Sequence, residues 1–254
     1  MKPHASWAGR VVGVLFIGYV LVALLGLDID IDRIVRGLPR GLKFVGGFFP
    51  PDFVSRIDEI ALGVRESLAM TVMSTVLGVA LAVPFAIGSA RNLAPRPVYV
   101  LCRTVVAAFR SLHEVILAVL FVAVVGFGPL AGVLTLIVAS IGFFAKLWAE
   151  AIEDVAVPPT QALTATGAAP AVWFAWAVWP QVAPRFVGLA LYRLDINFRE
   201  SAIVGIVGGG GIGATLNTAF ARYEYDDAAA IILVIIGIVL AVEVTSGRIR
   251  EAIQ

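Results

Sequence analysis

The sequence predicts an all-α protein that crosses a membrane about six times. The first observation is composition: of the 254 residues, 60% are hydrophobic and only 15% are charged, which is outside the usual range for a soluble domain. The second is that the apolar residues form long runs, and a helix needs about 20 residues to cross the ~30 Å hydrocarbon layer. We expect spans at residues 10–27, 62–89, 98–126, 129–148, 181–206 and 227–247.

The first span follows Lys2 and Arg10, a pattern shared by secretory signal peptides and membrane anchors. The run ends in ALLGLDID, which has no clear small-x-small cleavage site, and further spans follow it. We therefore predict a retained anchor helix. Together with the polar stretch after it, this helix forms an N-terminal part of residues 1–57, and residues 58–254 form the core.

The stretch LDIDIDRIVRGLPRGLKF after the anchor predicts an amphipathic helix. Its apolar residues recur at helical spacing opposite its basic ones, a pattern that suits a helix lying in the membrane interface. Pro50 and Pro51 then interrupt the chain before the second span. The apolar face is Ile31, Ile34, Val35, Leu38 and Leu42, and the basic face is Arg33, Arg36, Arg40 and Lys43.

The charges outside the spans predict the orientation only weakly. Basic residues, which favour the cytoplasmic side, divide into seven on one side and six on the other. The small excess favours both termini inside. The seven are Lys2, Arg10, Arg91, Arg96, Lys146, Arg248 and Arg250, and the six are Arg33, Arg36, Arg40, Lys43, Arg56 and Arg222.

Ionisable residues inside the predicted spans form one candidate site, a translocation path. Its residues are Arg110, Glu114, Arg193, Asp195 and Arg199. In the third span, the spacing of Arg103, Arg110 and Glu114 places all three on one helical face. Charged groups at membrane depth usually face a bundle interior or a water-filled path, where guanidinium groups could bind a passing oxyanion.

A structural role is the alternative for these charges, because i, i+4 pairs can simply neutralise each other and fix helix packing. The pairs in question are Arg110–Glu114 and Asp195–Arg199.

A long break follows the fourth span, at residues 150–180. Pro158 and Pro159 are expected to stop the preceding helix. Thr160 is then expected to cap a short helix of small residues, and Gly167 to end it. Such a slim helix can be approached closely by another protein.

The segment QALTATGAAPAVWFAWAVWP resembles the EAA loop of ABC importer permeases, whose pattern is E-A-A, three residues, G, nine residues and I-x-L-P. Residues 161–163 stand at the EAA positions, Gly167 at the glycine and Pro180 at the proline. The spacing is met, but glutamine replaces the glutamate, leucine the second alanine, and Ala177 and Trp179 the two late aliphatic residues. The residues that this resemblance expects at the ATPase contact are Gln161, Ala162, Leu163, Thr164, Gly167, Ala168 and Pro180.

The resemblance covers most of the chain from about Glu66 onward. The segments GFGPLAGVL at 126–134 and YRLDINFRESAIVGIVGGGGIG at 192–213 resemble the phosphonate/phosphate branch of these permeases. The resemblance implies the type I ABC importer permease fold in a bacterial inner membrane, with a translocation path for phosphonate- or phosphate-type oxyanions.

The same resemblance implies partners. It implies a second permease copy in a homodimer, two ATPase subunits that bind ATP and Mg, and a substrate-binding protein outside the cytoplasm. The EAA loop would form a coupling helix in a cleft of the ATPase, so this loop and both termini would be cytoplasmic. Membrane lipid surrounds such a subunit, and the net charge of +1, without a basic run, gives no reason to expect a nucleic acid.

The sequence contains none of the usual motifs for chemistry of its own. The ATP-binding motif G-x-x-x-x-G-K-[S/T] is missing, and so is any Gly-Lys dipeptide. H-E-x-x-H, C-x-x-C and G-x-S-x-G are missing as well. We expect a transport subunit rather than an enzyme, with no metal or cofactor in this chain.

The stretch GIVGGGGIGATLN at 205–217 matches the dinucleotide-binding pattern G-x-G-x-x-G. Here, however, a membrane helix precedes the glycines and a polar link follows them, so the strand and helix that give this pattern its function are missing. Close-spaced glycines permit positive φ and close backbone approach. We expect either a gate or hinge, or a plain helix end. The residues are Gly208, Gly209, Gly210, Gly211 and Gly213.

Two alternatives to an oxyanion permease remain at this stage. The nearer is a permease of the same superfamily for another small solute such as methionine. The other is a stand-alone secondary transporter or a membrane enzyme, although secondary transporters usually contain internal repeats with broken helices, and no such repeat is visible here.

Overall fold

The computed structural model describes residues 7–26 and 30–253, and every regular element within them is helical. The all-α prediction is therefore confirmed. The chain divides into two compact units, Met1–Gly47 and Phe48–Gln254.

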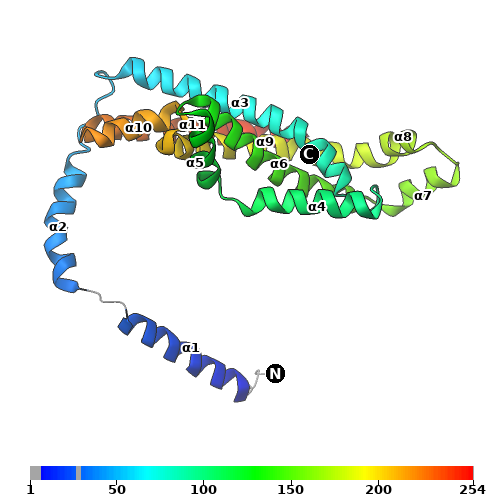
Figure 1. The fold of residues 1–254 in the computed structure, drawn as a ribbon, viewed down its shortest axis with the longest axis horizontal. Helices are drawn as coiled ribbons and strands as arrows, with labels where there is room; N and C mark the ends of the chain where they lie inside the picture. The colour runs from blue at the N-terminus through cyan, green and yellow to red at the C-terminus, as the bar shows by residue number, and fades with distance from the viewer. Residues whose placement is uncertain (1–6, 27–29, 254) are drawn as a thin grey trace. The chain divides into compact units, whose positions relative to one another are not determined.

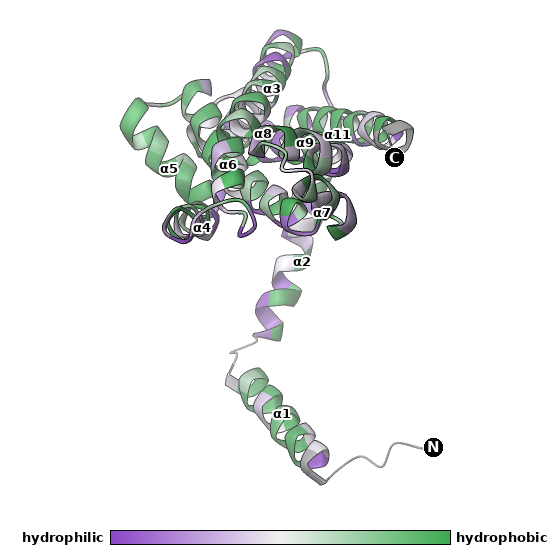
Figure 2. Ribbon diagram, turned by 90° about the vertical axis from the view of Figure 1, so that its right-hand side faces the viewer, coloured by the Kyte–Doolittle hydropathy of each residue, from purple (hydrophilic) through white to green (hydrophobic). Residues whose placement is uncertain are grey.

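The first unit contains α1, Trp7–Gly26, and α2, Ile31–Gly46. α1 is apolar from Val11 to Gly26, as expected of a span. Asp30 caps the start of α2: its carboxylate accepts a hydrogen bond of 2.9 Å from the backbone N–H of Arg33. No residue of α2 is buried, and Figure 2 shows hydrophilic and hydrophobic segments along it. Its place in the membrane interface stays a prediction.

The second unit is built around α3 and α6, which form the most extensive helix pair. They approach closely because Gly78 of α3 has no side chain: a Cβ there would lie 2.5 Å from the Cβ of Ser140. The helices of this unit, seen in Figure 1, are α3 (Ile57–Gly88), α4 (Arg96–Ser111), α5 (Glu114–Val125), α6 (Pro129–Glu153), α7 (Val157–Ala165), α8 (Pro170–Trp173), the π-helix η1 (Phe174–Val178), α9 (Trp179–Val204), the π-helix η2 (Gly205–Gly209), α10 (Gly211–Ala221) and α11 (Tyr225–Ile253).

By length and composition, four described helices can each cross a membrane, and two bent pairs raise the number of spans to as many as six. The four lie in Gly9–Gly26, Ile57–Ser89, Pro129–Glu153 and Tyr225–Ile249. Figure 2 shows mostly hydrophobic colours on α5 and α11, which suits surfaces facing lipid.

The prediction of one continuous helix over 98–126 is wrong. α4 and α5 meet at an angle of 89°. Leu112 between them is extended, and His113 caps α5 through its ring Nδ1, which accepts a hydrogen bond of 3.3 Å from the N–H of Val115. The chain therefore starts a new helix at the His113 cap, although the apolar residues continue on both sides of it.

The helix that contains the fifth predicted span begins before that span. Helical backbone runs from Pro170 to Val207, whereas the start was expected near Gln181. Pro180 lacks an N–H, and the preceding turn is a π-helix, the kind of local adjustment that lets a proline stay inside a helical run. The link predicted as polar after the glycines is also helical, because it forms α10.

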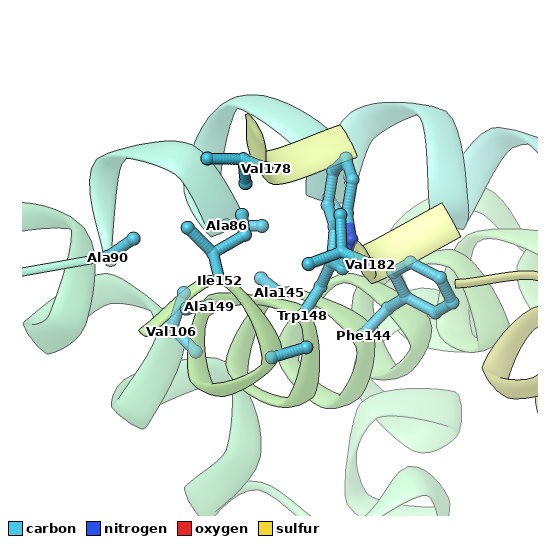
Figure 3. Packing of buried hydrophobic residues seen from close by; sticks show 12 residues of the cluster. Ala86, Ala90, Val106, Phe144, Ala145, Trp148, Ala149, Ile152, Val178 and Val182 are labelled. Carbon is cyan, nitrogen blue, oxygen red and sulfur yellow. The ribbon is translucent and has the colours of Figure 1, made fainter. Parts of the chain in front are cut away.

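The core near α7 is an aromatic and aliphatic cluster on α6. The Phe186 ring of α9 packs on Trp148 and Phe144, with ring centroids 4.6 Å and 4.8 Å apart. Figure 3 shows Val178 and Val182 beside Trp148 and Ile152. Because lipid tails are as apolar as these side chains, close packing rather than water exclusion holds such helices together.

Candidate functional site

A pocket of about 250 Å³ opens where the chain bends between α4 and α5. Three of the residues predicted for the path line it together: Arg110 at the end of α4, Glu114 at the start of α5 and Arg193 of α9. His113 and Phe143 line it as well. The bend therefore brings together charges from three helices.

Arg193 is the buried charge of this pocket, with 3% of its surface exposed. Its Nε donates a hydrogen bond of 3.0 Å to the hydroxyl of Ser140, and its guanidinium lies 5.2 Å from the centre of the Phe143 ring. Its Nη2 is 3.9 Å from a carboxylate oxygen of Glu114 and makes no hydrogen bond within the described part of the chain. The Nε of the guanidinium is therefore fixed by Ser140, whereas its Nη2 is only loosely paired with Glu114.

A polar network behind Arg193 was not predicted from the sequence. The amide nitrogen of Asn197 donates to the hydroxyls of Thr75 at 2.8 Å and Ser140 at 3.1 Å, so α3, α6 and α9 are joined where all three side chains are buried. The available signal was the presence of hydroxyl and amide residues inside apolar runs, since buried polar groups need partners.

The remaining predicted path charges are not part of this pocket. Asp195 and Arg199 form an i, i+4 ion pair at 3.3 Å, and the Arg199 side chain is 55% exposed. This pair is the one that the structural alternative predicted. The companion pair does not form, because the bend separates Arg110 from Glu114, which faces Arg193 instead.

Arg103 also departs from its predicted place on a face shared with Glu114. It forms an ion pair of 3.2 Å with Glu153 at the end of α6. This pair connects α4 to the segment just before α7.

The glycine segment forms a tight turn between α9 and α10, with a bend of 56° between the two helical runs. Gly208, Gly210 and Gly211 have φ of +105°, +76° and +70°, which residues with a side chain rarely adopt. At Gly213 a Cβ would lie 1.9 Å from the carbonyl oxygen of Ala202. These glycines are required by backbone geometry, and their role as a gate or hinge stays a prediction.

Two side chains of α3 cap the start of α10. Glu66 accepts a hydrogen bond of 3.0 Å from the N–H of Gly211, and the Ser67 hydroxyl accepts one of 3.0 Å from the N–H of Ile212. The glycine turn is thus fixed to α3 by polar contacts as well as by close packing at Gly211, where a Cβ would lie 2.5 Å from the Ser67 hydroxyl.

The predicted coupling segment is a short helix, α7, with no buried residue. Gly167 follows it with φ of +71°, as a helix-ending glycine should. Thr160 is not its cap, however, because α7 begins at Val157 and takes Pro158 and Pro159 into its first turn. Prolines are tolerated there because first-turn N–H groups have no partner within the helix.

The base of this segment is held by several contacts. The Trp173 indole N–H donates a hydrogen bond of 3.1 Å to the Thr160 carbonyl, and Gln181 accepts one of 2.9 Å from the N–H of Ala156. Of the predicted contact residues, Gln161, Ala162, Thr164, Gly167 and Pro180 are exposed, and Leu163 and Ala168 are half-buried. In Figure 1, α7 and α8 project from one end of the second unit and α10 lies toward the other.

A family model for binding-protein-dependent transport system inner membrane components matches residues 70–253. The chain belongs to this family. The permease is 40% identical over 237 residues to the phosphite transport system permease protein PtxC of Stutzerimonas stutzeri, with 92% of this chain and 86% of the relative covered. It is 40% identical over 203 residues to the phosphate-import permease protein PhnE of Mycolicibacterium smegmatis, with 80% of this chain and 38% of that one covered.

Solved structures agree with this assignment. The permease superposes on a chain of the MetNI methionine ABC transporter, described in inward facing conformations, with a TM-score of 0.65 and 25% identity. The match covers 77% of this chain and 96% of that one. The protein is thus a multi-pass inner-membrane permease subunit with the ABC importer permease fold.

Proposed function

We propose that this permease forms the path by which an ATP-driven importer carries phosphorus oxyanions, such as phosphite, phosphate or a phosphonate, into the cell. The pocket between α4, α5 and α9 carries the proposal. It places Arg110, which has no ion pair among the described residues, beside a buried Arg193 with an unused donor. Guanidinium donors match the geometry of such anions. The substrates named for the relatives are of the same chemical class.

The proposal includes the partners that supply energy and substrate. An exposed α7, held at its base and free on its outer surface, suits a coupling helix that enters a cleft of an ATPase subunit. On this proposal two permease copies pair with two ATPase subunits that bind ATP and Mg, and a binding protein delivers the anion from outside. The α7 end and both chain termini are then cytoplasmic.

Co-purification tests the coupling assignment. The tagged permease, extracted gently from its native membrane, should bring an ATPase subunit with it, and Gly167→Asp should lose that subunit. Arg222→Asp is the matched control, because it places the same charge on an exposed residue after α10 and should retain the subunit. A permease that stays folded and carries no ATPase would instead favour a transporter that works alone.

Uptake tests the substrate class. Proteoliposomes with the permease, its ATPase and its binding protein should accumulate labelled phosphite or phosphate when ATP is supplied. ATP-driven uptake of methionine with no uptake of an oxyanion would refute the proposed substrate class and favour the other importer alternative, in line with the methionine transporter that shares the fold.

A further inference from the structure

We propose that the Arg193–Glu114 pocket is a selective oxyanion site, in which Arg193 donates to an anionic oxygen while the Glu114 carboxylate accepts a hydrogen bond from a hydroxyl of the same anion. The site would therefore prefer an oxyanion that keeps a hydroxyl, such as phosphate, over sulfate, which keeps none at neutral pH. This inference rests on the proposed function and specifies its substrate.

The gap between the two side chains is the first support. Arg193 Nη2 and the nearest Glu114 oxygen are 3.9 Å apart, beyond hydrogen-bonding distance, and Nη2 has no other described partner although Arg193 is almost fully buried. A buried donor without a partner is costly, and a bound oxygen atom would satisfy it.

The fixed position of the guanidinium is the second support. Its Nε is bonded to Ser140, Ser140 is bonded to Asn197, and the Phe143 ring covers the guanidinium. The guanidinium of this pocket-lining residue is therefore preorganised, so little side-chain entropy is lost when an anion binds.

Size and charge also suit one oxyanion. At about 250 Å³ the pocket holds a tetrahedral anion and a few waters, since a water occupies about 30 Å³. The 12-residue helix α5 begins at this pocket, and its N-terminus adds partial positive charge.

Glu114 then supplies the selectivity. Its side chain is 23% exposed, so one carboxylate oxygen can face the pocket. An ionised carboxylate only accepts hydrogen bonds, so it attracts an anion that offers a hydroxyl and repels an anion that offers none. The same carboxylate that would weaken binding of sulfate therefore strengthens binding of protonated phosphate.

Equilibrium dialysis tests this with the full permease in lipid nanodiscs, radiolabelled phosphate and radiolabelled sulfate at neutral pH. We expect the wild type to bind phosphate about tenfold or more tightly than sulfate, the effect of one charge-assisted hydrogen bond. Glu114→Gln should bring the two affinities close together, because an amide can donate to sulfate. Arg193→Gln should lose both anions, and Glu243→Gln, at an exposed position of α11, should change neither.

Thermal unfolding of each variant checks that it is folded. If Glu114→Gln does not fold, Glu114→Asp takes its place, and the shorter side chain should lower phosphate affinity without lowering sulfate affinity. Equal losses for both anions, an unchanged preference in Glu114→Gln, or a wild type that binds neither anion would overturn the inference. ATP-driven uptake by the complete transporter tests the proposed function separately. If the transporter imports phosphate but its preference for phosphate over sulfate is the same in Glu114→Gln, only the inference is refuted.

Discussion

The carboxylate of Glu66 accepts a hydrogen bond of 3.0 Å from the N–H of Gly211, although the two residues are 145 positions apart. Ser67 makes the same kind of contact with the next N–H. The first N–H groups of a helix have no partner within it, so these two side chains complete the start of α10. They also determine where the glycine turn sits against α3.

Loss of this cap should lower the free energy of unfolding of the permease. Glu66→Ala is expected to destabilise the permease by about 1–2 kcal/mol, because it removes a charged acceptor from a helix N-terminus. Glu66→Gln should lose less, since its amide oxygen still accepts. Thermal unfolding in detergent measures both. An Ala variant as stable as the wild type would mean that the contact contributes nothing.

Gly213 should tolerate no side chain. A Cβ would meet the Ala202 carbonyl oxygen at 1.9 Å, so Gly213→Ala must displace α10 from α9, at a cost of about 2 kcal/mol or more. Gly237→Ala on α11 is the matched control, because a Cβ there meets nothing within 4 Å. Unfolding temperatures of the two variants should differ clearly, and similar values would show that the turn can relax.

The contacts of Gly211 with Glu66 and of Gly213 with Ala202 show what sequence patterns do not predict, namely contacts between residues of different helices. Long apolar runs predict the helices, because each span must satisfy its own backbone in lipid. Glu66 and Gly211 lie in different runs, and no local pattern predicts that one caps the other. The bend at Leu112–His113 was missed for a related reason, since a single side-chain cap redirects a helix without changing its hydropathy.

The candidate pocket was predictable only in part. Charges inside spans marked Arg110, Glu114 and Arg193, since ionisable groups there are costly. The Arg110–Glu114 pair was predicted on the assumption of one continuous helix. That prediction was wrong, because Glu114 faces Arg193 instead. Ser140 and Asn197 gave a weaker signal, because single polar residues are common in membrane helices.

Arg110 and Arg199 should differ in function although both were candidates. Arg110→Ala is expected to slow ATP-driven phosphate uptake roughly tenfold, because it removes an unpaired cation from the pocket. Arg199→Ala should leave uptake within about twofold, since Arg199 lies outside the pocket with a side chain that is 55% exposed. Initial rates at several phosphate concentrations measure both. Equal effects from the two variants would count against this division of roles.

The orientation can be tested with single cysteines in a Cys102→Ser background. Thr164→Cys on α7 and Arg222→Cys after α10 are both at exposed positions, on opposite sides of the last bent span pair. A membrane-impermeant thiol reagent added to intact spheroplasts should label Cys at position 222 and reach position 164 only after the membrane is opened. The reverse pattern would invert the proposed topology.

The helical run at residues 170–207 has a mechanical consequence. It is roughly 60 Å long at the usual rise per residue, with the proposed ATPase contact beside one end and the glycine turn at the other. Because the backbone between them stays helical, on the proposed function it would act as a lever, and a tilt of about 5° at the α8 end would move the glycine end by about 5 Å. A small displacement produced by ATP on one side of the membrane would therefore reach the opposite side through a single element, without a relay of separate contacts.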